Sequence, residues 1–291
     1  MIQYQQFIFD SYSFNSKSGK LELNYQLDDS VKFTEKYFFD FPFADYDQPA
    51  LDRALQLLFF LAGVSYYKTY LPPKVVIKSG QIDTHTADFL NKTYQKGLGE
   101  FFYVNKMDPR TPIKFPVNID TLSPLTPQAE PQGLLVGLGG GKDSLVSVEL
   151  LRSKQDLITW SLNHRPQLTP LVEQAGLPHA WVERTIDPVL LELNDQGVYN
   201  GHVPISAILA ATGVAVAILT GCKDVVVSNE SSASEPNLHY QGVDINHQYS
   251  KSIEFEKSFQ RLIKHQLGDT VRYYSLLRPF TEIRIAETEK Y

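Results

Sequence analysis

Residues suited to binding an anion gather in one short stretch, GGGKDS, which lies between the apolar run LLVGL and an apolar segment at helical spacing. Glycines let backbone N–H groups approach a ligand closely, and the positive end of a following helix favours the same negative charge. A serine adds a hydroxyl donor, and a lysine offers a cation. The stretch predicts a phosphate-binding loop made of Gly139, Gly140, Gly141, Lys142, Asp143 and Ser144.

Two common phosphate loops do not match this stretch. The dinucleotide fingerprint G-x-G-x-x-G, started at Gly137, requires its third glycine where Lys142 stands. The Walker A loop G-x-x-x-x-G-K-[ST] requires a glycine where Val136 stands and a hydroxyl where Asp143 stands. A carboxylate is unusual in a phosphate site, so Asp143 either positions Mg²⁺ or caps the helix, and both interpretations stay open. The alternative to a ligand site is a glycine turn that packs a helix tightly on a strand.

A second polar segment, SNESSASEPN at residues 228–237, follows the apolar run VVVS. Ligands of parallel sheets lie at the carboxyl ends of strands, so this segment suits nucleotide or metal contact. We assign Asn229 and Glu230 to the nucleotide, and Glu230 together with Asp143 to Mg²⁺. The alternative is a solvated turn with a helix cap.

Candidate proton-transfer groups lie in NHQYSKS, residues 246–252, which holds His247, Tyr249 and Lys251. Such side chains carry protons in catalysis when burial or neighbouring charge tunes their pKa values. His202 is a further candidate, because it precedes a long apolar segment and a helix N-terminus favours neutral imidazole. The alternative for each histidine is a hydrogen-bonded structural role.

Alternating strands and helices must position these segments. From residue 133 on, the apolar runs LLVGL, LITWSL, WVERT and VVVSN alternate with helical patterns at residues 145–151, 168–175 and 203–222. This alternation predicts an α/β fold with a doubly wound, mostly parallel sheet over residues 133–291.

The segment from Val203 to Cys222 has twenty residues without a charge, which is long enough to span a bilayer. It is built largely of alanine, glycine, serine and threonine, and it has no aromatic or basic anchors at its ends. We therefore predict a helix buried between the sheet and another layer, starting near Pro204 and stopping at Gly221.

The first part of the chain has a different pattern. Strand patterns at residues 2–9, 21–27 and 31–39 precede helical patterns at 51–67 and 87–101, with a short strand in PPKVVIKSG. These predict a smaller α+β domain over residues 1–115. In AGVSYYK the aromatic residues continue a helical stripe, so they are expected to pack, and Lys68 is the residue that can face a cleft. A proline-rich linker is predicted at residues 116–132.

Composition narrows the class of partner. The net charge is −6, the pI is about 5.7, and no block of lysines or arginines is present, which argues against nucleic acid and favours a small ligand. The single cysteine, Cys222, excludes an internal disulfide framework and suits a reducing compartment. The first residues lack a secretory pattern, so a cytoplasmic protein is expected.

The loop GGGKDS resembles the S-G-G-x-D-S loop of the adenylating PP-loop ATP pyrophosphatases, an adenine nucleotide alpha hydrolase-like fold. Gly140, Gly141, Asp143 and Ser144 match, whereas Gly139 replaces the usual first serine and removes one hydroxyl donor. The resemblance implies that ATP is bound by the loop, that an oxygen nucleophile attacks its α-phosphate, and that pyrophosphate leaves.

Longer segments extend the resemblance across the chain. AGVSYYKTYLPP, NGHVPISAI, SNESSASEPN and NHQYSKSIEFE are similar to segments of the UDP-N-acetylmuramoyl-L-alanyl-L-glutamate epimerase family. This resemblance implies ATP-dependent inversion of the terminal L-glutamate of UDP-MurNAc-L-Ala-L-Glu, a peptidoglycan precursor, through an acyl-adenylate. AMP, pyrophosphate and the D-glutamate product would result.

One departure from that family concerns the end of the chain. The family continues into a segment of the form C-x-x-C-x-K-C, whereas this sequence ends at Tyr291 and has only Cys222. A truncated chain and a natural short form both stay open. So do two other functions: another adenylating enzyme, such as an amide ligase or a tRNA-modifying enzyme, and an ATP-binding module without turnover.

Overall fold

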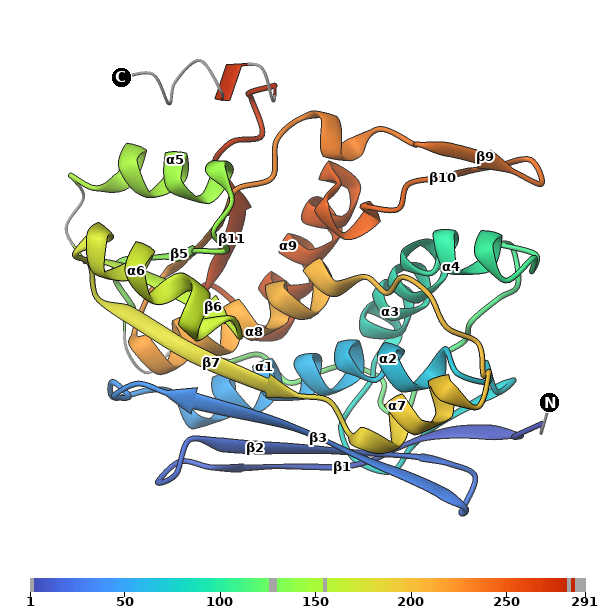
Figure 1. The fold of residues 1–291 in the computed structure, drawn as a ribbon. Coiled ribbons are helices and arrows are strands. Elements are labelled where there is room, and N and C mark those ends of the chain that lie inside the picture. Colours follow the sequence, from blue (N-terminus) through green and yellow to red (C-terminus); the bar gives the residue numbers. More distant parts are fainter. Residues whose placement is uncertain (1–2, 126–129, 154–155, 282–283, 286–291) are drawn as a thin grey trace.

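The computed structural model describes residues 3–125, 130–153, 156–281 and 284–285. Nine strands form one sheet in the order β11-β8-β5-β6-β7-β3-β2-β1-β4, and Figure 1 shows how the chain is distributed along it. The strands from the second half of the chain are β5 (Leu134–Gly137), β6 (Leu157–Leu162), β7 (His179–Thr185), β8 (Asp224–Val227) and β11 (Arg272–Ser275).

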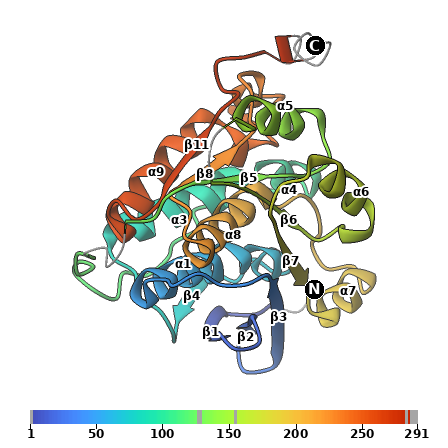
Figure 2. The same ribbon diagram turned by 90° about the vertical axis from the view of Figure 1, so that its left-hand side faces the viewer.

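These five strands lie side by side and pair in parallel throughout. The chain adds β6 and β7 on one side of β5 and then returns to add β8 and β11 on the other side. Helices α5 (Lys142–Leu151) and α6 (Arg165–Ala175) cover one face, and α8 (Ile205–Thr220) covers the other (Figure 2). The prediction of a mixed α/β fold with a mostly parallel sheet is confirmed.

Strand β5 is apolar throughout because both faces of the sheet are covered at this strand. Successive side chains of a strand point to opposite faces, so Val136 packs with Val148 of α5 while Leu135 packs into the cluster that contains α8. A parallel strand covered on both faces needs this continuous apolar run.

The first half of the chain supplies β1 (Gln6–Asn15), β2 (Lys20–Leu27), β3 (Val31–Asp40) and β4 (Lys74–Ile77). The first three form an antiparallel meander, and β3 then pairs antiparallel with β7, so both halves of the chain share one sheet. They also share one apolar core. The division into residues 1–115, 116–132 and 133–291 stays a prediction, and part of the linker, 126–129, lies outside the described residues.

Two predicted helices are each divided in the structure. The pattern at 51–67 forms α1 (Gln48–Ala62) and α2 (Val64–Tyr67), and the pattern at 87–101 forms α3 (Thr84–Gly97) and α4 (Gly99–Val104). Gly63, between α1 and α2, lies so close to β1 that an added Cβ would stand 2.5 Å from Cε1 of Phe9. Close packing of the backbone on an aromatic ring therefore requires glycine at the junction of α1 and α2.

The uncharged segment forms α8, which is buried between α1 and the sheet. Gly221 ends it in the left-handed region with φ 72°, and the Gly221 N–H donates to the carbonyls of Ala217 and Ile218. Small residues allow a close approach, since a Cβ added to Gly213 would lie 3.1 Å from Trp160. The buried-helix prediction is confirmed, and among the described residues no helix has the length and apolar character needed to cross a membrane.

Several elements were not anticipated from the sequence. They are α7 (Pro188–Asp195), the hairpin of β9 (Leu238–Tyr240) and β10 (Val243–Ile245), the 3₁₀ turns η1 (Ser232–Ser234) and η2 (Tyr249–Lys251), and α9 (Ile253–Leu267). Helix α9 is amphipathic, begins with Ser252 as its N-cap and packs against α3 and β11. The segment that carries the proton-transfer candidates thus leads into a well-anchored helix.

Candidate functional site at the carboxyl edge of the parallel strands

The two predicted ligand-binding loops lie side by side. GGGKDS follows β5, and the segment 228–237 follows β8, its parallel neighbour. The chain leaves β5 toward β6 on one side and leaves β8 toward β11 on the other side, so the two connections diverge between β5 and β8 and leave a crevice at the carboxyl ends of these strands. This topological switch point is the usual ligand site of an open α/β sheet.

The glycine loop is open toward this crevice. A Cβ added to Gly139 or Gly141 would meet no described atom within 4 Å. Gly141 is the N-cap of α5 and provides no side-chain cap, so no capping side chain of Gly141 covers the positive end of this helix. Asp143 lies in that turn, Lys142 is half-buried there, and the Ser144 hydroxyl donates to the Gly141 carbonyl oxygen at 2.7 Å.

Gly140 and Gly141 allow a paired prediction. Gly140 has φ +79°, and an added Cβ would lie 2.9 Å from Cδ2 of Leu168, so Gly140→Ala should destabilise the fold by about 1–2 kcal/mol. Gly141 has φ −86°, so Gly141→Ala should leave the unfolding free energy nearly unchanged while its methyl group blocks the anion and weakens ATP binding. Urea unfolding and calorimetric ATP titration of both variants check this. Equal stability of the two variants would contradict it.

A cavity of about 480 Å³, which we call the loop pocket, lies beside the glycine loop. Its wall combines loop residues with apolar side chains of β6 and α8, including Gly139, Gly141, Trp160, Leu162 and Leu209. Trp160 is 4% exposed, and its Nε1 has no hydrogen-bond partner in the part of the chain that the structure describes. The pocket therefore offers an apolar surface, an unsatisfied donor and an adjacent anion loop.

A second cavity of about 450 Å³, the polar pocket, lies next to it. It is lined by Asp143, Glu230, Glu235, His247 and Lys251, among other residues. The two cavities have four lining residues in common among those described: Asp143, Ser228, Asn229 and Lys251. A ligand in one cavity can therefore contact a ligand in the other at the end of the glycine loop.

The structure brings together three of the four proton-transfer candidates. His247 and Lys251 line the polar pocket, and the His202 ring centroid lies 6.4 Å from that of His247. Burial lowers the pKa of His202, which favours its neutral form. His247 Nδ1 is buried and, within the described residues, has no hydrogen-bond partner. Tyr249 lies elsewhere: it is buried against a different cavity, and burial raises the pKa of its hydroxyl.

The metal candidates line the polar pocket together. The Glu230 carboxylate accepts hydrogen bonds from the backbone N–H and the hydroxyl of Ser232, at 2.6 and 2.7 Å. No group of three or more histidine, cysteine or acidic side chains in the described ranges is arranged to hold a metal ion. Mg²⁺ is commonly held by one or two carboxylates plus substrate phosphates, so Asp143 and Glu230 stay predictions for such a site.

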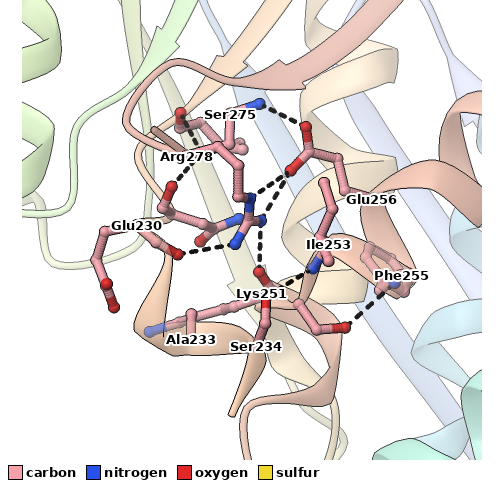
Figure 3. A network of polar contacts seen from close by, with 12 residues as sticks. Glu230, Ala233, Ser234, Lys251, Ile253, Phe255, Glu256, Ser275 and Arg278 are labelled. Atoms are coloured by element: carbon pink, nitrogen blue, oxygen red, sulfur yellow. Dashed lines mark hydrogen bonds and ion pairs between the residues drawn. The ribbon is translucent and has the colours of Figure 1, made fainter. Parts of the chain in front are cut away.

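Arg278 connects the segment 228–237 to the segment 246–252, and sequence patterns gave no indication of it. Its guanidinium donates to the Glu230 and Lys251 carbonyl oxygens at 2.8 and 2.7 Å, and to Oε2 of Glu256 (Figure 3). The Arg278 and Glu256 side chains are 15% and 7% exposed. Ser234 Oγ adds a further link by accepting from the Ile253 N–H at 3.1 Å. This buried ion pair thus holds the two polar segments at a defined separation.

Removing Arg278 should be costly. Arg278→Met leaves the Glu256 carboxylate buried without its cation, so unfolding free energy should fall by about 3–5 kcal/mol. Pairing it with Glu256→Gln should recover part of that loss, because the buried charge is then removed as well. Urea unfolding of both single variants and the double variant measures the coupling. If the loss of unfolding free energy in the double variant equals the sum of the losses in the two single variants, the two side chains are not coupled.

Lys68 does not face the described pockets. It is 5% exposed and donates to Oδ1 of Asn200 at 2.7 Å, and burial lowers its pKa to about 8. Between pH 8 and the usual pKa of 10.5, Lys68 is protonated in the unfolded state but largely deprotonated in the folded state. The free energy of unfolding should therefore rise with pH in this range. Thermal unfolding of wild type relative to Lys68→Met across this range checks the slope. If the difference in stability between wild type and Lys68→Met stays constant across this pH range, the pKa of Lys68 is not lowered by burial.

The fold and the site define a mostly parallel α/β protein with a glycine-rich loop at its switch point. By sequence, the chain belongs to the MurL family, whose N-terminal domain model matches residues 1–276. The chain is 36% identical to the UDP-N-acetyl-alpha-D-muramoyl-L-alanyl-L-glutamate epimerase of Xanthomonas oryzae pv. oryzae (strain MAFF 311018), covering 99% of this chain and 66% of that protein. The resemblance to this family is thereby confirmed.

A relative with the same name from Salinispora tropica (strain ATCC BAA-916 / DSM 44818 / JCM 13857 / NBRC 105044 / CNB-440) is 37% identical over 97% of this chain and 63% of its own length. The chain thus spans slightly less than two thirds of the length of these curated relatives. No solved structure matches the chain.

Proposed function

We propose that this chain binds ATP and activates the terminal glutamate of UDP-N-acetylmuramoyl-L-alanyl-L-glutamate for inversion to D-glutamate. The observation that carries the proposal is the junction of the loop pocket with the polar pocket, at Asp143 and Lys251. A nucleotide in one cavity and an acyl group in the other would meet beside GGGKDS. The names of the relatives supply the substrate.

The residues present fit ATP. The loop pocket suits an adenosine group, because an apolar wall covers a base and Trp160 Nε1 can donate to a ring nitrogen. The exposed glycine backbone and the first turn of α5 suit the phosphates. Asp143 and Glu230 are the carboxylates for the accompanying Mg²⁺. The strand order and the resemblance of the loop support a PP-loop fold, with Gly139 in place of serine.

ATP acts here as a substrate that makes the α-proton removable. An ionised carboxylate discourages carbanion formation, because negative charge would develop next to negative charge. We propose that the carboxylate oxygen bonds to the α-phosphorus while the bond to pyrophosphate breaks, giving an acyl-adenylate. A base then takes the α-proton, a proton returns to the opposite face, and water cleaves the anhydride to AMP and the D-glutamate product.

The polar pocket supplies groups for the proton transfers. His247 is the base we favour, because it lines the cavity and has an unpartnered ring nitrogen in the described structure. Lys251 lines both cavities, so its ammonium suits negative charge that develops on the acyl oxygen or the phosphates. The His202 ring lies next to that of His247, and burial lowers the pKa of His202, so His202 is suited to be a neutral neighbour of the proposed base.

Pyrophosphate release by the purified 291-residue chain tests the proposal. The assay contains ATP, Mg²⁺ and UDP-MurNAc-L-Ala-L-Glu, and the product glutamate is analysed for chirality. We expect substrate-dependent pyrophosphate release. Formation of D-glutamate would place the proton-transfer groups within this chain, whereas release without inversion would leave those groups outside it. ATP binding with no release under any condition would overturn the proposal in favour of a nucleotide-binding module.

A further inference from the structure

A third cavity, of about 630 Å³, has no part in the chemistry proposed above. We call it the hairpin pocket, because it lies between α3, the β9–β10 hairpin and η2. Figure 1 shows the hairpin extending from the site toward α3 and α4. Its lining includes Lys92, Lys96, Pro236, Asn246, Tyr249 and Glu254.

The hairpin pocket adjoins the polar pocket. Pro236 and Asn246 line both cavities, so they form a shared wall. Asn246 is held in place by its own hydrogen bonds: Nδ2 donates to the Ala233 carbonyl and Oδ1 accepts from the Gln248 N–H. The three cavities therefore follow one another from the glycine loop to the hairpin. A ligand that begins beside the loop can continue into the hairpin pocket.

Two lysines of this cavity lie close enough together to contact one anion. Lys92 and Lys96 lie one helical turn apart on α3, and both contact Oε1 of Glu254, at 2.6 and 2.8 Å. Arg110, Asp88 and Asp244 also line the cavity, so its described lining carries three cationic and three acidic side chains. The Asp244 carboxylate contacts Nδ1 of His239 at 2.8 Å. The lysine pair already contacts one oxyanion, the Glu254 carboxylate, and it can contact the oxygens of a phosphate in the same way.

Tyr249 gives an independent indication of a ligand. It is 4% exposed, and its hydroxyl has no hydrogen-bond partner among the described residues. A buried hydroxyl without a partner is unfavourable, and a bound ligand can provide that partner. Lys96 Nζ lies 5.7 Å from the centroid of the Tyr249 ring, so the phenol and the cation face the same cavity.

We infer that the hairpin pocket binds the nucleotide diphosphate end of the substrate, with Lys92 and Lys96 on the diphosphate and the Tyr249 hydroxyl as a hydrogen-bond partner. This inference rests on the proposed function. The glutamate must reach the glycine loop, while a further amino acid and a sugar separate it from the diphosphate. An extended chain covers roughly 3.3–3.6 Å per residue, which carries the diphosphate beyond the polar pocket. Lysines are common ligands of phosphate groups.

Binding of UDP-N-acetylmuramic acid, which lacks the dipeptide, tests the inference without requiring turnover. Isothermal titration of the wild-type chain should show binding. Lys92→Gln/Lys96→Gln should weaken it at least ~10-fold, because two charge-assisted contacts are lost. Tyr249→Phe should weaken it about 3–10-fold, in line with one hydrogen bond. Glu254→Gln should tighten it, because a competing carboxylate is removed.

The matched control is Lys257→Gln/Lys264→Gln, which removes two exposed lysines of α9 that are not among the pocket-lining residues described here. It should bind like wild type, and ATP should not displace UDP-N-acetylmuramic acid from any of these proteins. No binding by wild type, equal binding by both double variants, or displacement by ATP would each overturn the inference. The proposed function fails separately, if UDP-N-acetylmuramic acid binds as expected but no substrate-dependent pyrophosphate is released.

Discussion

Asp143→Ala should reduce Mg²⁺-dependent pyrophosphate release at least ~100-fold, an effect typical of losing a group that stabilises charge in the transition state. Asp143 is the carboxylate that lines both the loop pocket and the polar pocket among the described residues, and it lies on the first turn of α5. It is therefore placed where Mg²⁺ would bridge phosphates to the protein. Asp143→Asn keeps the shape and loses the charge, so it should lose nearly as much activity.

The fold should tolerate the same change. An acidic residue in the first turn contributes about 0.3–1 kcal/mol through the helix dipole, so the thermal midpoint should fall by only a few degrees. Glu149→Ala is the matched control, because Glu149 lies on the same helix, is exposed and pairs with Arg152. It should retain full activity. If Asp143→Ala keeps more than half of the wild-type rate, the loop is not the site of activation.

His247→Gln should slow incorporation of solvent deuterium at the glutamate α carbon by about 10²–10⁴-fold, the usual contribution of a general base. Pyrophosphate release should change far less, because activation of the carboxylate does not use this imidazole. Glutamine retains hydrogen-bonding capacity but does not accept a proton at neutral pH. Mass spectrometry of the product in D₂O, together with a pyrophosphate assay, separates the two steps.

The control for this prediction is His85→Gln. His85 is exposed on α3 and its ring stacks on His265, with 4.8 Å between the ring centroids. It should leave both steps unchanged. If His247→Gln slows deuterium incorporation and pyrophosphate release equally, the imidazole acts in substrate binding or in the structure of the site, not as the base. Unchanged deuterium uptake would remove it as the base and direct attention to Lys251.

Each of the two loops of the site can be recognised from the sequence alone. The glycine triplet between a strand and a helix predicts an anion-binding turn wherever that strand lies, because the prediction depends only on the backbone of neighbouring residues. The same holds for the segment after β8. That these two loops meet depends on β8 pairing directly with β5, and the spacing along the chain does not specify which strands pair.

The proton-transfer candidates show the limit of sequence patterns. His247, Tyr249 and Lys251 lie within five residues, and the pattern treats them as equivalent. In the structure, the 3₁₀ turn η2 directs Tyr249 into the hairpin pocket, whereas His247 and Lys251 line the polar pocket. Which pocket each side chain enters is decided by helices α3, α8 and α9, which pack around the turn.

The sequence by itself determined the local elements: the buried strands, the glycine loop, and the buried helix α8, whose uncharged small residues predict close packing on both sides. Local periodicity depends on residues a few positions apart, so it can be recognised without the fold. The tertiary structure alone decided that β3 joins β7, that Arg278 links Glu230 to Lys251, and that three cavities adjoin. These contacts join residues far apart in the chain, and packing of the shared core selects them.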